Sequence, residues 1–270
     1  LNKMTSSHAI TISTNGSTTC AETRHLTPPA STSSHQHNQS HLKQQHLGNV
    51  ANGGSDKGNH STSPSCSKTP NFHNVYTIVR SLLYSKLDGR LLYHGADHTF
   101  GEVLPAAIRL AKWEKLTEED TLIVKTAALF HDTGFLDQYD RNEPLGCQRA
   151  KDLLQENGYS ENQVKRVCEC VMATQMPQNP KGNLLAEVVC DADLAYLGTD
   201  NLFLRSECLR LELNAVKNLD ISPRQWNITS LEFLRNHSYW TKSANERLKP
   251  IKEMHIHRMM ELLNMQEGSN

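Results

Sequence analysis

Apolar residues recur at helical spacing along most of the chain. From Phe72 onward they stand three or four positions apart, as Ile78 and Leu82 do, which places them on one face of a helix. No stretch of useful length alternates between apolar and polar residues as a strand would. The pattern predicts an all-α fold, with helices at about residues 74–87, 93–114, 120–132, 144–157, 161–174, 183–197, 202–218, 223–239 and 242–265.

Glycine, asparagine and proline mark the ends of several predicted helices. Gly134 follows the third helix, Asn157 and Gly158 follow the fourth, and a proline-containing stretch follows the fifth. Pro105 lies inside the second helix. We expect it to kink that helix, because proline removes one backbone donor and crowds the preceding turn.

The first 70 residues lack this periodicity. They consist mainly of Ser, Thr, Asn, Gln, Gly and His and contain no Phe, Trp or Tyr. Such a segment cannot bury enough apolar surface to offset its ordering entropy, so we expect residues 1–70 to be a disordered tail and residues 73–265 to form the folded domain. Seven of the 14 histidines lie in the tail without a repeated ligand spacing, which favours a solvated low-complexity segment over a metal-storing one.

Charge and hydropathy exclude some classes of partner. A formal net charge of -1 and a pI near 7.0 provide no basic surplus for a phosphate backbone, so extended nucleic acid is not an expected partner. No run approaches the roughly 18 apolar residues of a membrane-spanning helix, so no membrane is expected either. We expect a cytoplasmic protein, although the Ser-rich, acid-poor tail leaves organelle targeting open. The seven cysteines form no C-x-x-C pair, which indicates reduced, mostly buried thiols.

A His-Asp pair ends the most apolar helix of the chain. Residues 121–130 are apolar nearly all round, which predicts a position in the middle of the bundle. His131 and Asp132 follow directly. Two ionisable side chains at the end of a buried helix are costly unless they are paired or bound to a ligand. Their position therefore makes them candidates for a functional site.

His94 and His98 form a second candidate pair. A spacing of four residues places two side chains one above the other on one helical face, so both could line one metal-centred pocket. The alternative is that one imidazole satisfies a neighbouring backbone group while the other is exposed.

Two aspartates interrupt the apolar helix predicted near residue 190. Asp193 shares its helical face with Val189 and Leu197, whereas Asp191 shares its face with Glu187. We therefore expect Asp193 to point into the core and Asp191 to point away from it. A carboxylate in an apolar core needs a cation, and no obvious Lys or Arg lies nearby in the sequence, so Asp193 is the stronger candidate for a metal ligand.

His98, His131, Asp132 and Asp193 together make a mixed nitrogen and oxygen ligand set for one divalent metal ion. Two imidazoles argue against a pure magnesium site, and the lack of a thiolate argues against a structural zinc. Manganese, iron, cobalt, nickel and catalytic zinc fit this set better than magnesium alone.

These residues resemble the HD superfamily of metal-dependent phosphohydrolases, whose minimal pattern is a His, a His-Asp pair and a distant Asp. The resemblance covers roughly residues 75–240 and is carried by the segments 93–99, 127–135, 173–180 and 190–198. The segments around His94 and Asp193 are also similar to those of cyclic nucleotide phosphodiesterases. In those enzymes the first His protonates the leaving group and the second binds metal. The resemblance thus implies that His94 is a general acid and that His98 is a metal ligand.

Two departures limit what the resemblance implies. Asn142 and Glu143 stand where many relatives have a His-Glu pair, which argues against a complete second metal site. No histidine occurs between His131 and His237, whereas the di-iron oxygenases of this fold use additional histidines there. Oxygenase chemistry and the HD-GYP class are therefore disfavoured.

The implied function is metal-dependent hydrolysis of a phosphoester, by a phosphomonoesterase or phosphodiesterase acting on a nucleotide or another small phosphorylated metabolite. His94 would protonate the leaving group, and Asp132 would serve both as a ligand and as a catalytic residue. Glu143, Gln178 and Asn179 are candidates for lining the pocket, or are ordinary turn and loop residues. The alternative is a catalytically silent module of the HD fold that binds a nucleotide or has a regulatory role.

Overall fold

Residues 69–267, the part of the chain that this computed structural model describes, fold into helices and the loops between them. No strand occurs among these residues, so the all-α prediction is confirmed. The tail predicted for residues 1–70 lies outside the described residues except for its last two. The elements are α2 (Phe72–Lys86), a π-helix (His98–Val103), α3 (Leu104–Trp113), α4 (Glu118–Phe130), a 3-10 helix (Thr133–Leu136), α5 (Glu143–Glu156), α6 (Glu161–Ala173), α7 (Leu184–Asp193), a second 3-10 helix (Ala195–Gly198), α8 (Leu202–Lys217), α9 (Pro223–Asn236), α10 (Lys242–Arg247) and α11 (Lys249–Glu267).

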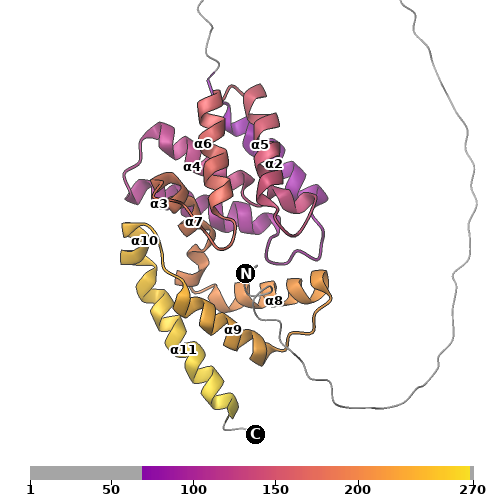
Figure 1. The fold of residues 1–270 in the computed structure, drawn as a ribbon, viewed down its shortest axis with the longest axis vertical. Helices are drawn as coiled ribbons and strands as arrows, with labels where there is room; N and C mark the ends of the chain where they lie inside the picture. The colour runs from indigo at the N-terminus through magenta and orange to yellow at the C-terminus, as the bar shows by residue number, and fades with distance from the viewer. Residues whose placement is uncertain (1–68, 268–270) are drawn as a thin grey trace, which may run out of the picture. The chain divides into compact units, whose positions relative to one another are not determined.

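Helix α4 is the central helix of the N-terminal group. It packs against α2, α3, α5, α6 and α7, and residues 127–130 are completely buried. This confirms the central position predicted from its apolar sequence. The last four helices, α8 to α11, gather below this group in the view of Figure 1, where α11 packs along α9.

The helix predicted at 93–114 is shorter and less regular than expected. Residues 92–95 form a bend, and the π-helix comes shortly after it. The amide of Leu104 donates to the carbonyl of Thr99, five residues earlier. Pro105, which has no amide hydrogen, follows as the second residue of α3. The irregularity expected at this proline thus takes the form of a π-helix directly before it.

The segment predicted as one helix at 242–265 is two helices that meet at Leu248. A close contact accompanies the break, since a Cβ on Gly198 would lie 2.5 Å from the carbonyl oxygen of Leu248 and 2.7 Å from its Cβ. Glycine is therefore needed where the second 3-10 helix meets the break. Helix α9 also ends before the predicted boundary, at Asn236, where the buried ammonium of Lys252 donates to a carbonyl of its last turn.

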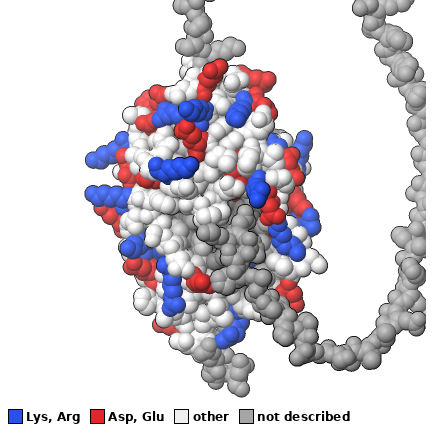
Figure 2. Space-filling model, viewed as in Figure 1, with Lys and Arg blue, Asp and Glu red and all other residues white. Residues whose placement is uncertain are grey.

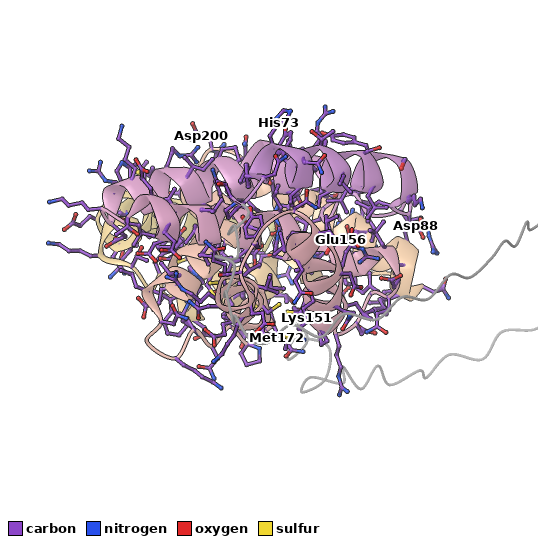
Figure 3. The ribbon with its side chains drawn as sticks, turned by 90° about the horizontal axis from the view of Figure 1, so that it is seen from above. His73, Asp88, Lys151, Glu156, Met172 and Asp200 are labelled. Atoms are coloured by element: carbon purple, nitrogen blue, oxygen red, sulfur yellow. The ribbon has the colours of Figure 1, made fainter. Side chains whose placement is uncertain are left out.

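Charged side chains are mixed over the surface. Figure 2 shows Lys and Arg intermingled with Asp and Glu over the described part of this face. The residues labelled in Figure 3 are exposed; they are His73, Asp88, Lys151, Glu156, Met172 and Asp200. No helix among residues 69–267 is long and apolar enough to cross a membrane. The cysteines in this range are free thiols, and three of them (Cys147, Cys170 and Cys190) are buried.

Candidate metal centre

His131 and Asp132 stand at the point where α4 ends. His131 is the C-terminal cap residue, and its Nδ1 lies 2.8 Å from the carbonyl oxygen of Ala128. Since a carbonyl can only accept, Nδ1 carries the hydrogen and Nε2 keeps its lone pair. His131 therefore presents a ligand atom at the buried end of α4.

Two glycines let neighbouring backbone segments close around this helix end. A Cβ on Gly146, in α5, would lie 2.7 Å from the Phe130 carbonyl oxygen, and one on Gly134 would lie 1.9 Å from the Asn142 carbonyl oxygen. Neither position has room for a larger residue. The turn that carries Asp132 is consequently held tightly between α4 and α5.

His98 comes from the start of the π-helix. It is buried, and its Nδ1 lies 3.0 Å from the carboxylate of Glu102, four residues later. We assign the hydrogen to Nδ1, which donates to this carboxylate and leaves Nε2 as the free nitrogen. That nitrogen lies 3.2 Å from Oδ1 of Asp193, the last residue of α7.

The four predicted ligands come together in space. Nε2 of His131 lies 3.1 Å from Oδ2 of Asp132 and 3.7 Å from Oδ1 of Asp193. Nε2 of His98 lies 3.8 Å from the same Asp132 oxygen. Ligand atoms of His98, His131 and Asp193 all lie within 4.8 Å of one another. With metal–ligand bonds of about 2.1 Å, neighbouring ligand atoms lie about 3.0 to 3.4 Å apart, so the cluster is close to the size that one metal ion needs.

When both imidazoles are neutral, the ligand atoms of this cluster face one another without hydrogen atoms between them. Both histidines use Nδ1–H elsewhere, so nitrogen lone pairs face carboxylate oxygens. Nε2 of His131 and Oδ2 of Asp132 are buried and have no hydrogen-bond partner. Unpartnered buried polar atoms are costly, and a divalent cation would satisfy them together. The residues present therefore fit a metal of the expected kind.

The carboxylates also change the proton affinity of the imidazoles. Burial alone would lower the pKa of His98, but the carboxylates of Asp193 and Glu102 outweigh it and raise the pKa to about 9. The pKa of His131 is likewise raised, against its burial, by Asp132 and Asp193. In turn, although burial opposes it, His131 lowers the pKa of Asp132 well below its ordinary value. A site that attracts protons in this way attracts a metal cation for the same electrostatic reason.

The prediction that Asp191 points away from the core is wrong. Asp191 is completely buried, whereas the side chain of Asp193 is 16% exposed. The Asp191 carboxylate accepts hydrogen bonds from the amides of Trp240 and Thr241, at 2.9 and 2.8 Å, and from the Thr241 hydroxyl at 2.7 Å. Burial nevertheless raises the pKa of Asp191 to about 6. The chain segment before α10 covers this side of α7, which the periodicity of α7 alone cannot reveal.

His94 lies near the cluster, but not on one helix with His98. The arrangement predicted for the pair is wrong, because residues 92–95 form a bend. The two ring centroids are 6.3 Å apart, and the His94 ring stacks on Phe135 at 4.2 Å. Nδ1 of His94 lies 2.5 Å from the buried carboxylate of Glu212. With Nδ1 bonded and the side chain 16% exposed, Nε2 is the nitrogen available to a ligand.

Helix α8 supplies a carboxylate that the sequence analysis did not identify. Besides the His94 ring, Glu212 accepts hydrogen bonds from the amides of Tyr93 and His94 and from the Tyr139 hydroxyl. Burial would raise the pKa of Glu212, but the contact with His94 lowers it below its usual value. Glu212 is therefore a buried, ionised anchor for the segment that carries His94.

The sequence did contain a signal for this anchor. Glu212 and Arg205 stand seven residues apart and share a helical stripe with the buried residues Leu202, Leu209 and Leu213. Two opposite charges within an apolar stripe indicate a buried polar contact with another part of the chain.

The three residues expected to line the pocket differ in burial. Glu143 is buried, its Oε2 has no hydrogen-bond partner, and burial together with the carboxylates of the cluster raises its pKa. Gln178 donates to Asp193 at 3.4 Å and accepts from the indole N–H of Trp240 at 3.3 Å. Asn179 is exposed. Glu143 and Gln178 thus adjoin the cluster, and no contact of Asn179 supports a place in it.

Comparisons with known proteins add no family assignment. No family model, curated protein or solved structure matches the chain significantly. The HD resemblance therefore rests on the sequence motifs of this chain alone.

Proposed function

We propose that this protein is a metal-dependent phosphohydrolase of the HD type, which hydrolyses a phosphoester in a nucleotide or another small phosphorylated metabolite. The observation that carries the proposal is the cluster of His98, His131, Asp132 and Asp193, whose nitrogen and oxygen atoms lie 3.1 to 3.8 Å apart near His94. Phosphoester hydrolysis can use a divalent cation to activate water and an imidazole to donate a proton to the leaving group, and candidates for both lie side by side at this site.

His98, His131, Asp132 and Asp193 would hold the metal ion. Their two imidazoles favour manganese, iron, cobalt, nickel or zinc over magnesium. When bound, such a metal lowers the pKa of a coordinated water toward about 7 and polarises phosphoryl oxygens. Glu143 would accept a hydrogen bond from the attacking water, since its Oε2 is buried near the cluster without a partner.

His94 would protonate the leaving oxygen. The contact of its Nδ1 with Glu212 and the stacking on Phe135 fix the ring. Because Nδ1 is engaged, Nε2–H is the proton available for transfer. After the transfer, Glu212 would keep the remaining hydrogen on Nδ1, so that the ring returns to the same orientation for the next cycle.

The surroundings of Asp193 support a nucleotide as the substrate. Trp240 is 44% exposed, yet its indole N–H is held by Gln178, which in turn donates to Asp193. An exposed indole fixed beside the cluster offers a surface on which a nucleobase can stack. Extended nucleic acid is not proposed as a substrate, because a chain with a net charge of -1 has no basic surplus to neutralise a phosphate backbone.

The second candidate function is a catalytically silent module that binds a nucleotide or a regulator. The position of His94 favours the enzyme, because a silent module has no need of an imidazole backed by a buried carboxylate beside its metal ligands.

Hydrolysis of a nitrophenyl phosphate ester by the full chain with added Mn²⁺ tests the proposal. We expect activity that disappears on chelation and in Asp132→Asn, but persists in Asp152→Asn, which changes an exposed aspartate of α5. A chain that binds Mn²⁺ but hydrolyses neither this ester nor any of a panel of nucleotides would instead be the silent module.

Replacement of His94 separates its role as an acid from a role as a ligand. His94→Ala should retain the metal and slow the hydrolysis of an ester with an alkoxide leaving group by about 10² to 10⁴. A nitrophenolate leaving group needs little protonation and should be released almost normally. Equal slowing of both esters would point to positioning, and loss of metal would make His94 a ligand.

A further inference from the structure

Two buried side chains of α8 hold the non-helical segment that precedes the π-helix. Glu212 accepts from the amides of Tyr93 and His94. Arg205 donates to the carbonyls of Leu92 and Tyr93, at 3.4 and 2.5 Å. Two amides and two carbonyls of this segment are thus satisfied by one carboxylate and one guanidinium from a single helix.

Arg205 also reaches a partner of the metal ligands. Its Nε lies 3.0 Å from Oε2 of Glu102, the same oxygen that lies 3.0 Å from Nδ1 of His98. This contact is an ion pair, since Nε–H does not point straight at the oxygen. The guanidinium also lies 4.6 Å from the centre of the Tyr93 ring. One arginine therefore touches both the segment of His94 and the carboxylate that orients His98.

This arrangement meets a requirement of histidine ligands. The partner of the second ring nitrogen fixes the tautomer and orientation of a metal-bound imidazole, and its loss typically weakens metal binding 10- to 100-fold. Glu102 can serve in this way only if its own flexible side chain is fixed, and its side chain is 25% exposed. Arginine suits this task, because its planar fork of donors can hold several acceptors at fixed angles.

We propose that Arg205 is a positioning residue, which fixes His98 through Glu102 and, by holding the main chain at Tyr93, sets the distance between the metal ligand and the acid His94. The inference rests on the proposed function. The contacts of Arg205 are with Glu102, Leu92 and Tyr93, none of which is a proposed metal ligand, so it would act through other residues.

Calorimetric titration of the metal-free full chain with Mn²⁺ tests the proposal. We expect Arg205→Met and Glu102→Gln each to weaken Mn²⁺ binding 10- to 100-fold. The double variant should be little weaker than either single variant, because both changes break one chain of contacts. Arg205→Lys, which keeps the charge but not the fork, should recover part of the affinity.

Arg210→Gln is the matched control. Arg210 is also an arginine of α8 that pairs with a glutamate and donates to a carbonyl, but its partners are Glu207 and Ile221, away from the cluster. If the role of Arg205 is purely structural, Arg205→Met and Arg210→Gln should both lower the unfolding temperature. Neither should then change the affinity for Mn²⁺. If Arg205→Met does not fold, Glu102→Gln and Arg205→Lys decide the question.

The outcomes separate this inference from the proposed function. Wild-type affinity in Glu102→Gln and in the folded Arg205 variants would overturn the positioning role and leave the hydrolase intact. Weakened Mn²⁺ binding in a protein that hydrolyses no phosphoester would support the positioning of His98 and overturn the hydrolase. A wild-type chain that binds no metal would overturn both.

Discussion

Asp191 and Asp193 stand two residues apart on α7 and illustrate two different uses of a carboxylate. Asp191 is completely buried, and three protein donors from Trp240 and Thr241 surround it. Asp193 is more exposed and faces the Nε2 atoms of His98 and His131, at 3.2 and 3.7 Å. The carboxylate of Asp191 thus has its hydrogen-bond donors within the protein. The carboxylate of Asp193 instead faces nitrogen atoms that act as acceptors when the imidazoles are neutral.

The difference shows that burial alone does not identify a ligand. A buried carboxylate with donors around it anchors the fold, because its hydrogen bonds offset its desolvation. A carboxylate that faces other lone pairs requires a proton or a metal ion between them. The chemical nature of the neighbours, and not the depth of the residue, separates the proposed functional side of α7 from the structural side.

The largest effect is expected for the functional side. Asp193→Ala should weaken Mn²⁺ binding by about 10³-fold or more, equivalent to about 4 kcal/mol, because it removes a ligand rather than a partner of a ligand. Calorimetric titration measures this loss directly. Unchanged affinity in this variant, or a larger loss in Asp191→Ala, would reverse the roles assigned to the two aspartates.

On the structural side, replacement of Asp191 should lower the stability of the fold instead of the affinity for metal. Asp191→Ala should lower the free energy of unfolding by about 3 kcal/mol, since it leaves two amides and a hydroxyl near the start of α10 without their acceptor. Urea denaturation of the metal-free protein measures the change, and Asp200→Ala, at an exposed site near the end of the second 3-10 helix, is the control. Metal stoichiometry should stay at the wild-type value in both variants.

The contribution of His237, the C-terminal cap of α9, to stability should fall in acid. Burial and the nearby Lys252 lower the pKa of His237 to about 3 in the folded protein, from 6.5. As the pH falls below 6.5, the unfolded chain takes up a proton that the folded protein does not, so stability is lost. We expect a loss of roughly 2 kcal/mol between pH 7 and pH 4, less than the shift alone implies because the residue is only half-buried.

The variant His237→Asn isolates this effect. Asparagine keeps an acceptor for Lys252, whose Nζ lies 3.4 Å from Nδ1 of His237, but does not titrate. The difference in unfolding free energy between wild type and variant, measured by urea denaturation with chelator present, should therefore change with pH in this window. A difference that is constant from pH 7 to pH 4 would show that the pKa of His237 is the same in the folded protein as in the unfolded chain, and would contradict the prediction.

The smallest effect is expected for Trp240, which belongs to both sides. Its amide donates to Asp191, and its indole N–H donates to Gln178 beside Asp193. If the indole stacks on a nucleobase, Trp240→Ala should raise KM for a nucleotide about 10-fold, or about 1.4 kcal/mol, and leave kcat nearly unchanged. Trp240→Phe should retain most of the affinity, and an ester without an aromatic base should not distinguish the variants.

Local pattern was enough to predict most of the helices, though not the π-helix or the break at Leu248, and to select the residues that meet in the cluster. His131, Asp132 and Asp193 stand at helix ends, where a polar residue after an apolar run is visible in the sequence. Contacts between distant segments could not be predicted in this way. Glu212 lies 118 residues from His94, and Asp191 lies 50 residues from Thr241, so neither partner appears within any helical period.

At Gly101, in the middle of the π-helix, the number of residues matters more than the identity of the side chain. No atom outside the helix backbone lies within 4 Å of the place where a Cβ would stand, so a side chain fits there. Deletion of the same residue would instead allow a regular α-helix, which would turn His98 by about 100° and move it about 1.5 Å relative to α3. The imidazole would then leave Asp193. Substitutions of Gly101 should therefore be accepted, whereas its deletion should abolish metal binding.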